Sequence, residues 1–204
     1  MNKLSIALFT LLLAACSIGP AAKDAPATYD LGAPRNYSGE QIKIRHGVLV
    51  YSVAAPSWLD SQAIVYRLNY QDAARQQSYA NSRWAAPPAA LLTQRLRSRL
   101  AAASNGGIIN VADSARADYT LRIELEDFSQ VFDAADASRA VVVARASIVN
   151  LAKRTLHAQK SFTLERAAAS PNAEGGVRAL AAAGDELIEA VVAWTAASLT
   201  PEKK

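Results

Sequence analysis

The chain has 204 residues, of which 51% are hydrophobic and 20% are charged, with 22 Lys and Arg against 18 Asp and Glu. This is ordinary globular composition, and it excludes a disordered, collagen-like or disulfide-scaffold protein. The basic residues are scattered along the chain instead of gathering in one stripe, so we expect no nucleic-acid partner. One cysteine and two histidines argue against structural zinc and iron–sulfur sites. We therefore expect neither a metal nor a cofactor.

The start of the chain has the pattern of a secretion signal. Lys3 supplies a positive charge, and residues 4–13 form an apolar run of ten residues. That run is shorter than the roughly 20 residues that a membrane-spanning helix needs. It leads into the tetrapeptide Leu13-Ala14-Ala15-Cys16. This tetrapeptide resembles the lipobox of bacterial lipoproteins, which implies that a signal peptidase recognises it, removes residues 1–15 and leaves an acylated Cys16 as the first residue of the mature protein.

The same resemblance predicts a membrane anchor and its location. Each buried methylene of an acyl chain contributes about 0.8 kcal/mol, so two or more chains, palmitate among them, hold a protein stably where one is marginal. Ser17 follows the cysteine, instead of the Asp typical of lipoproteins retained in the inner membrane. We therefore expect the periplasmic face of the outer membrane of a Gram-negative bacterium. Residues 16–27 are small and Pro-bearing, which predicts a flexible tether with a reach of roughly 18 Å.

Residues 28–199 are expected to form the folded domain, and residues 200–204 a polar tail. In the first half, β-rich stretches predict strands at 47–53 and 64–68, with 77–81 as the hairpin partner of the second strand. A helix is expected to begin at Pro87-Pro88, because proline suits the first helical turn. Its apolar positions recur with helical spacing at Leu92, Leu96 and Leu100.

The second half predicts three further long elements and a short strand at 108–111. Alternating apolar and polar residues predict strands over 119–126, 139–151 and 156–164, with residues 150–154 as a tight hairpin turn. The last helix is expected over 176–198, with Gly184 on its apolar line as a point of close approach to the sheet. Together these elements predict a single α+β domain, a mostly antiparallel sheet with two main helices packed on one face.

Catalytic constellations are missing from the sequence. His46 and His157 stand at no spacing typical of a metal site or a triad, and no nucleophile elbow, Rossmann or phosphate-binding loop is present. Glu124 and Glu126 share one strand face, which is typical of a solvated surface. We therefore assign no catalytic residue and expect a protein that is not an enzyme. The three tryptophans, Trp58, Trp84 and Trp194, can serve either core packing or a partner surface.

Several short segments along the mature chain match a known family. They are Tyr29-Asp30-Leu31, Leu59-Asp60, Ile64-Val65-Tyr66-Arg67, Tyr79, Arg83-Trp84-Ala85-Ala86-Pro87-Pro88, Leu91-Leu92 and Ala117-Asp118-Tyr119-Thr120-Leu121. Through them the chain resembles the auxiliary lipoprotein components of ABC-type transport systems. The Arg-Trp-Ala-x-Pro-Pro run is the most specific match, although Ala86 stands where an acidic residue is common in that family.

The resemblance implies a docking or structural subunit in (phospho)lipid transport between the two membranes. Its partners would be an ABC permease, an ATPase and a substrate-binding protein of the mammalian cell entry (MCE) class, and a homo-oligomer is compatible with that role. Arg83, Trp84 and Trp58 are the candidate partner-binding residues. Alternatively, Trp84 packs over the hairpin and the prolines only fix the start of the helix. Two other functions stay open: a lipoprotein for outer-membrane assembly or cell-wall attachment, and a periplasmic hydrolase.

Overall fold

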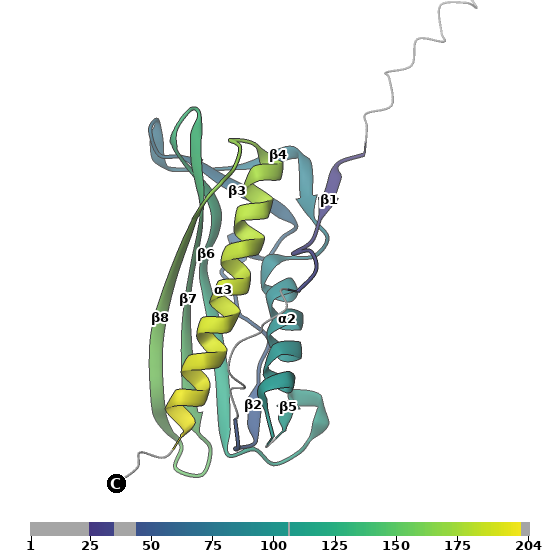
Figure 1. Cartoon of the computed structure of the whole chain (residues 1–204), viewed down its shortest axis with the longest axis vertical. Coiled ribbons are helices and arrows are strands. Elements are labelled where there is room, and N and C mark those ends of the chain that lie inside the picture. Colours follow the sequence, from purple (N-terminus) through teal and green to yellow (C-terminus); the bar gives the residue numbers. More distant parts are fainter. Residues whose placement is uncertain (1–24, 35–43, 106, 201–204) are drawn as a thin grey trace, which may run out of the picture.

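The computed structural model describes residues 25–34, 44–105 and 107–200 (Figure 1). The predicted signal peptide and the predicted acylation site Cys16 lie outside the described residues. The strands are β1 (Ala27–Tyr29), β2 (Val48–Val50), β3 (Ala63–Leu68), β4 (Asp72–Trp84), β5 (Ile108–Asn110), β6 (Tyr119–Ala134), β7 (Ala137–Asn150) and β8 (Thr155–Ala167). The helices are α2 (Pro88–Ala103) and α3 (Ala173–Leu199), with single 3-10 turns η2 (Ser57–Leu59) and η3 (Val111–Asp113).

The 16-residue strand β6 organises the sheet. One edge of β6 pairs along its length with β7, which pairs in turn with β8, and all three strands are antiparallel. The other edge is divided between two strands: β2 pairs with its first half, with Val48 opposite Tyr119, and β3 with its second half, with Tyr66 opposite Gln130. β5 extends the sheet beyond β2, and β4 and β1 extend it beyond β3.

The prediction of a mostly antiparallel sheet is wrong. β1–β4, β2–β5, β2–β6 and β3–β6 are parallel pairs, and among the described strands only β3–β4, β6–β7 and β7–β8 are antiparallel. The sheet is therefore mixed, and it curls as a half-barrel around the two helices (Figure 1). Hairpins are visible in a sequence because a short turn joins the two strands, whereas parallel neighbours are separated by a long crossover. The predicted strand at 47–53 shortens to three residues, and its partner on β6 lies 71 positions along the chain.

The predicted hairpin turn at residues 150–154 is confirmed. Asn150 pairs with Thr155 across it, and the Asn150 side-chain oxygen accepts a 2.8 Å hydrogen bond from the backbone N–H of Lys153. Arg154 takes the left-handed conformation, with φ of 56°, that closes the turn. A β-bulge follows, between the pairs of Ile148 and Val149.

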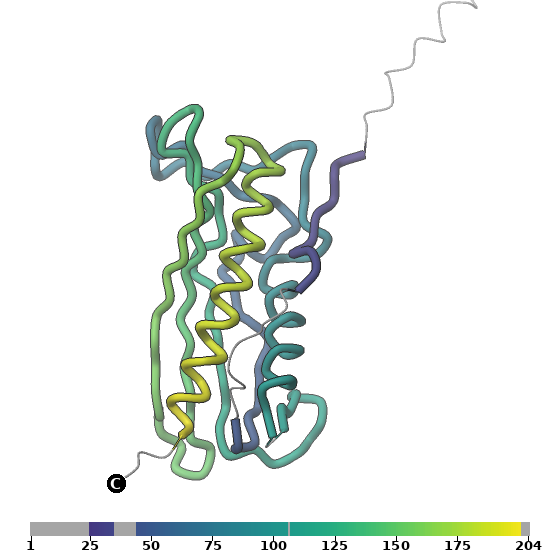
Figure 2. Tube along the Cα trace, viewed as in Figure 1, coloured from purple at the N-terminus to yellow at the C-terminus, as the bar shows by residue number. Residues whose placement is uncertain are grey.

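Both predicted helices are present, and Figure 2 shows them side by side on the same face of the sheet. The helix α2 begins at Pro88 as expected, and Leu92, Leu96 and Leu100 are each at most 1% exposed. Gly184 on α3 is buried, but its closest neighbour is on the other helix: a Cβ at this position would lie 3.2 Å from Leu92 Cδ2. The close approach is thus between α2 and α3. No helix in the described part of the chain is long and apolar enough to cross a membrane.

Candidate functional site

Trp84 ends β4 and is completely buried, at 0% exposure. Its ring lies 5.7 Å from that of Phe128 on β6, and its backbone N–H donates a 2.8 Å hydrogen bond to the carbonyl of Gln62. The indole Nε1 has no hydrogen-bond partner among the described residues. In this conformation Trp84 fills the core beside the start of α2 and offers no surface to another molecule.

The other two candidate partner-binding residues lie apart from this ring and have different neighbours. Arg83 is exposed, and its Nε donates a 3.4 Å hydrogen bond to Thr28 Oγ1 on β1. Trp58 on η2 is half-buried, with the guanidinium of Arg67 5.3 Å from its ring centroid. Arg67 also forms a 2.6 Å ion pair with Asp127. The structure therefore does not gather Arg83, Trp84 and Trp58 into one site.

Residues 27–34, which we call the strap, cross the domain at the end where the predicted tether would enter, and we call this end the tethered end (Figure 1). They begin as β1, which adds to the edge of β4, with Tyr29 opposite Trp84. Leu31 is 5% exposed and belongs to the core. Gly32 follows with a positive φ of 69°, a conformation that glycine adopts without steric cost, and its N–H donates a 2.7 Å hydrogen bond to the Asp30 carboxylate. The strap is thus anchored by both backbone and side chain.

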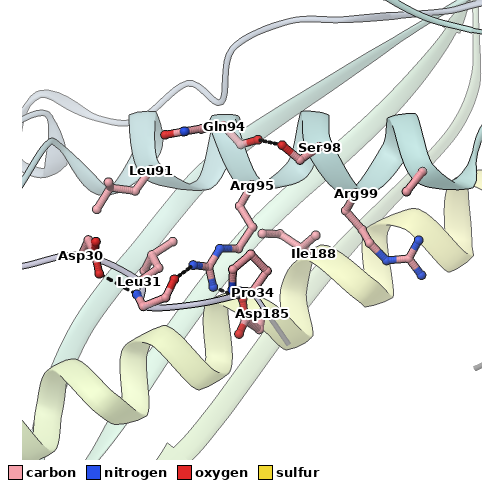
Figure 3. Close-up of a pocket in the computed structure, with 12 residues that line it drawn as sticks. Asp30, Leu31, Pro34, Leu91, Gln94, Arg95, Ser98, Arg99, Asp185 and Ile188 are labelled. Carbon is pink, nitrogen blue, oxygen red and sulfur yellow. Dashed lines mark hydrogen bonds and ion pairs between the residues drawn. The ribbon is translucent and has the colours of Figure 1, made fainter. Parts of the chain in front are cut away.

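An ion pair between the helices fixes the far end of the strap. Arg95 of α2 reaches Asp185 of α3 with an Nη1–Oδ1 distance of 2.5 Å, and its Nη2 donates a hydrogen bond to the carbonyl of Gly32 (Figure 3). The two side chains are only 13% and 6% exposed. A second pair, Arg99–Glu189 at 2.6 Å, lies further along the same two helices. Sequence reasoning missed Arg95 and Asp185, because 90 positions separate them and each is an ordinary charged residue of an amphipathic helix.

Two cavities border the strap. One, of about 390 Å³, lies between the strap, α2 and α3, and combines the apolar side chains of Leu31, Leu91 and Ile188 with Arg95 and Asp185. The other, of about 620 Å³, lies on the α3 side, beside Tyr29 and Val177. Figure 3 shows the Arg95 side chain extending from α2 toward the strap across the first cavity. Arg95 and Asp185 in this lining already bind one another, so the arrangement is suited to holding the strap.

A polar network supports the start of α3. The hydroxyl of Tyr79 donates a 2.9 Å hydrogen bond to Gln130 Oε1, and Gln130 Nε2 donates to Ser138 Oγ at 2.8 Å. Burial, with a smaller contribution from Tyr66, raises the pKa of Tyr79 to about 12. A Cβ at position 176 would overlap the end of the Gln130 side chain, so a larger residue in this turn of α3 would displace Gln130. The network positions α3 against the sheet.

Several other titratable residues have polar partners near the surface. Glu124 and Glu126 both approach Arg145, at 2.6 and 3.4 Å, so this carboxylate pair is bridged by a cation across the strands. His46 Nδ1 lies 3.5 Å from Asp118 Oδ2, and His157 Nε2 lies 2.8 Å from the carbonyl oxygen of Ser198. In the described ranges, no three His, Cys, Asp or Glu residues gather as a metal site would require.

Solved structures share this fold. A crystal structure of a Xanthomonas campestris protein of the DUF330 family matches with a TM-score of 0.70 at 20% identity, over 85% of this chain and 94% of that one. An uncharacterised protein matches with a TM-score of 0.64 at 17% identity, over 84% and 99%. A hypothetical protein of Chlamydia trachomatis gives 0.53 at 8% identity, over 76% and 98%. No curated protein is significantly similar to the chain.

The match to a protein family is more specific than these likenesses of fold. Residues 29–192 match the ABC-type transport auxiliary lipoprotein component family, from β1 through most of α3. The match includes the strap from Tyr29 onward, both residues of the Arg95–Asp185 pair and the whole sheet apart from the first two residues of β1. It confirms the resemblance found in the sequence, and the chain belongs to the ABC-type transport auxiliary lipoprotein family.

Proposed function

We propose that this protein is a docking subunit of an MCE-class ABC transport system, anchored by its acylated N-terminus to the periplasmic face of the outer membrane. The observation that carries the proposal is the family match over residues 29–192, which describes an auxiliary lipoprotein of ABC-type transport. The lipobox ending at Cys16 supports the anchor, and Ser17 after it supports the outer membrane over the inner one. Transport of phospholipid between the membranes is the activity that this subunit would assist.

The geometry supports a binding role for the domain. The Arg95–Asp185 pair clamps the strap at the point where the tether enters the fold, so a pull on the tether is transferred to both long helices. The candidate acid–base groups of the sheet, Glu124 and Glu126, are occupied by Arg145. These features favour a fixed scaffold over a hydrolase, because a hydrolase needs a nucleophile beside a base in a concave site.

Fractionation of cells tests the anchor. The Cys16→Ala variant is expected to leave the outer membrane and to be recovered uncleaved or unacylated, because the cysteine thiol is the acylation site that the lipobox implies. The control is Ser17→Asp, which keeps the acylation site and is expected to shift the protein to the inner membrane. A Cys16→Ala protein that still sediments with outer membranes at the wild-type level contradicts the proposed anchor.

Binding of the partner tests the docking role. Full-length, acylated protein purified in mild detergent is expected to bind the purified MCE-class protein of the same organism. If the wild-type protein binds no MCE-class protein in detergent or in lipid, the proposed role is wrong. If it instead co-purifies with outer-membrane assembly factors or peptidoglycan, the alternative of assembly or cell-wall attachment takes its place.

A further inference from the structure

The end of the domain opposite the strap carries exposed apolar side chains. The tip of the β7–β8 hairpin places Leu151 at 39% exposure and Leu156 at 59%, which are high values for leucine. Exposed leucines are common singly, so these two gain meaning only together with the charged residues beside them.

Cations without ion-pair partners surround these leucines. Lys153 and Arg154 lie in the turn between the two leucines, and both are exposed. The backbone N–H of Leu151 donates a 3.0 Å hydrogen bond to the carbonyl of Asp118, which brings the loop containing Arg116 beside the turn. His46 contacts Asp118, and this places the exposed Arg45 at the same end.

Four exposed cations lie at this end among the described residues. None of the four cations, Arg45, Arg116, Lys153 and Arg154, forms an ion pair with any described residue. The nearby carboxylate of Asp118 is occupied by the N–H of Gly47 at 3.1 Å and by His46. We call this surface, made of Arg45, Arg116, Leu151, Lys153, Arg154 and Leu156, the basic tip.

The basic tip also lies far from the tether. Tyr29 of the strap lines a cavity with Val177 and Ala181, near the start of α3. Beside the tip, His157 contacts the carbonyl of Ser198, near the end of α3. About 20 helical residues lie between these two levels, which correspond to about 30 Å along the helix axis. A membrane-bound tether that enters at the strap therefore leaves the basic tip free to reach another molecule.

We propose that the basic tip is the docking surface for an acidic protein face with an apolar centre, belonging to the partner of this subunit. The inference rests on the proposed function, because it names the surface through which that docking would occur. Charge complementarity selects the partner: four unpaired cations around two leucines fit a protein surface in which carboxylates surround an apolar patch. The distance of the tip from the strap favours a protein in the periplasm over the anchoring membrane itself.

Two double variants with matched chemistry test the proposal. Lys153→Glu with Leu156→Ser reverses one charge and removes one exposed apolar side chain at the tip. Arg75→Glu with Tyr70→Ser makes the corresponding changes at the β3–β4 turn, where Tyr70 is 44% exposed and Arg75 is an exposed cation. That turn adjoins the far end of β6, because Asn69 bonds to the carbonyl of Phe132. All four residues are exposed, so the thermal melts of both variants should match that of the wild-type protein.

Affinity for the purified MCE-class protein of the same organism is the measurement, with full-length acylated protein in detergent. The tip variant should bind at least tenfold more weakly and the control variant within twofold of the wild type, and the wild-type affinity should fall between 50 and 500 mM salt. If the tip variant binds with wild-type affinity, or if both variants lose affinity equally, the basic tip is not the docking surface, while the proposed function stands. If the wild-type protein does not bind, both fail. Tip-dependent binding to phosphatidylglycerol vesicles with none to the protein would also overturn the inference.

Discussion

The tethered end of the domain and the basic tip differ in whether their cations are paired and buried or exposed. At the tethered end Arg95 is paired with Asp185 and Arg67 with Asp127, and both pairs are largely buried. At the tip, Lys153 and Arg154 extend from a turn with no carboxylate partner among the described residues. Paired, buried arginines hold elements together, whereas unpaired, exposed cations are available to a second molecule. Trp84, in the most specific family-like run, thus lies in the buried interior of the molecule.

The largest expected effect is that of Trp84→Ala, which removes a fully buried aromatic side chain next to Phe128. Such truncations cost about 3–5 kcal/mol of unfolding free energy. Urea unfolding of the purified domain measures it, and affinity for the MCE-class protein is measured on the same sample. If the melt is unchanged and binding is lost, Trp84 contacts the partner directly and the division between a structural end and a binding end fails.

Removing the inter-helix arginine should come next. Arg95→Leu leaves Asp185 without its arginine and frees the strap carbonyl of Gly32, at a cost of about 3 kcal/mol. The matched control is Arg178→Leu on α3, whose exposed pair with Glu174 is worth less than about 0.5 kcal/mol. Chemical denaturation compares the two. Equal losses of unfolding free energy in the two variants would show that the buried Arg95–Asp185 pair stabilises the fold no more than the exposed Arg178–Glu174 pair.

A bulkier residue at the helix contact should have a smaller effect. Gly184→Leu adds a side chain where a Cβ alone would be 3.2 Å from Leu92 Cδ2 and 3.7 Å from Phe128 Cε2. Overpacking costs about 1–3 kcal/mol, which exceeds the gain in helix propensity of just under 1 kcal/mol. A lower midpoint in a thermal melt is expected. A raised midpoint would mean that α2 and α3 separate easily, and that the strap clamp is weaker than the geometry indicates.

Alkaline pH should produce the smallest effect, through the hydroxyl of Tyr79. The pKa of Tyr79 is about 12 in the folded protein, above the ordinary value of 10.0. The unfolded chain therefore loses this proton first, so the stabilising contribution is complete below pH 10 and declines as pH rises through 12. Stability curves for the wild type and Tyr79→Phe measured between pH 9 and 11.5 should converge as pH rises. Parallel curves would contradict the raised pKa.

The sequence predicts local features of this fold well. The β7–β8 hairpin, the start of α2 at Pro88 and the position of α3 follow from alternation, proline placement and helical periodicity. The strand predicted over 119–126 is the first half of β6, which continues to Ala134. The parallel pairing escaped prediction. Strands were expected at 47–53 and 108–111, but β2 and β5 are too short to show which strand they pair with, and their partners are set by tertiary packing.

The same limit applies to the sites. A tryptophan beside an arginine and two prolines is conspicuous in a sequence, and it predicted a binding role for a side chain that the fold buries. The sequence predicted only a hairpin turn at the tip, because Lys153 and Arg154 are typical of any solvated loop. Its character depends on the arrival of Arg116 and Arg45 from other parts of the chain, and this gathering is not encoded locally.

The divided edge of β6 has a consequence for the order in which the chain can fold. β2 and β3 are synthesised before β6, yet each pairs with β6 in the folded sheet. Val48 of β2 lies opposite Tyr119, and Tyr66 of β3 lies opposite Gln130. Non-local parallel pairing is slow, because the loop must close before the contacts form. The hairpins of β6, β7 and β8 should therefore assemble first and act as a template. Until then the N-terminal third of the domain stays open to aggregation or to a chaperone.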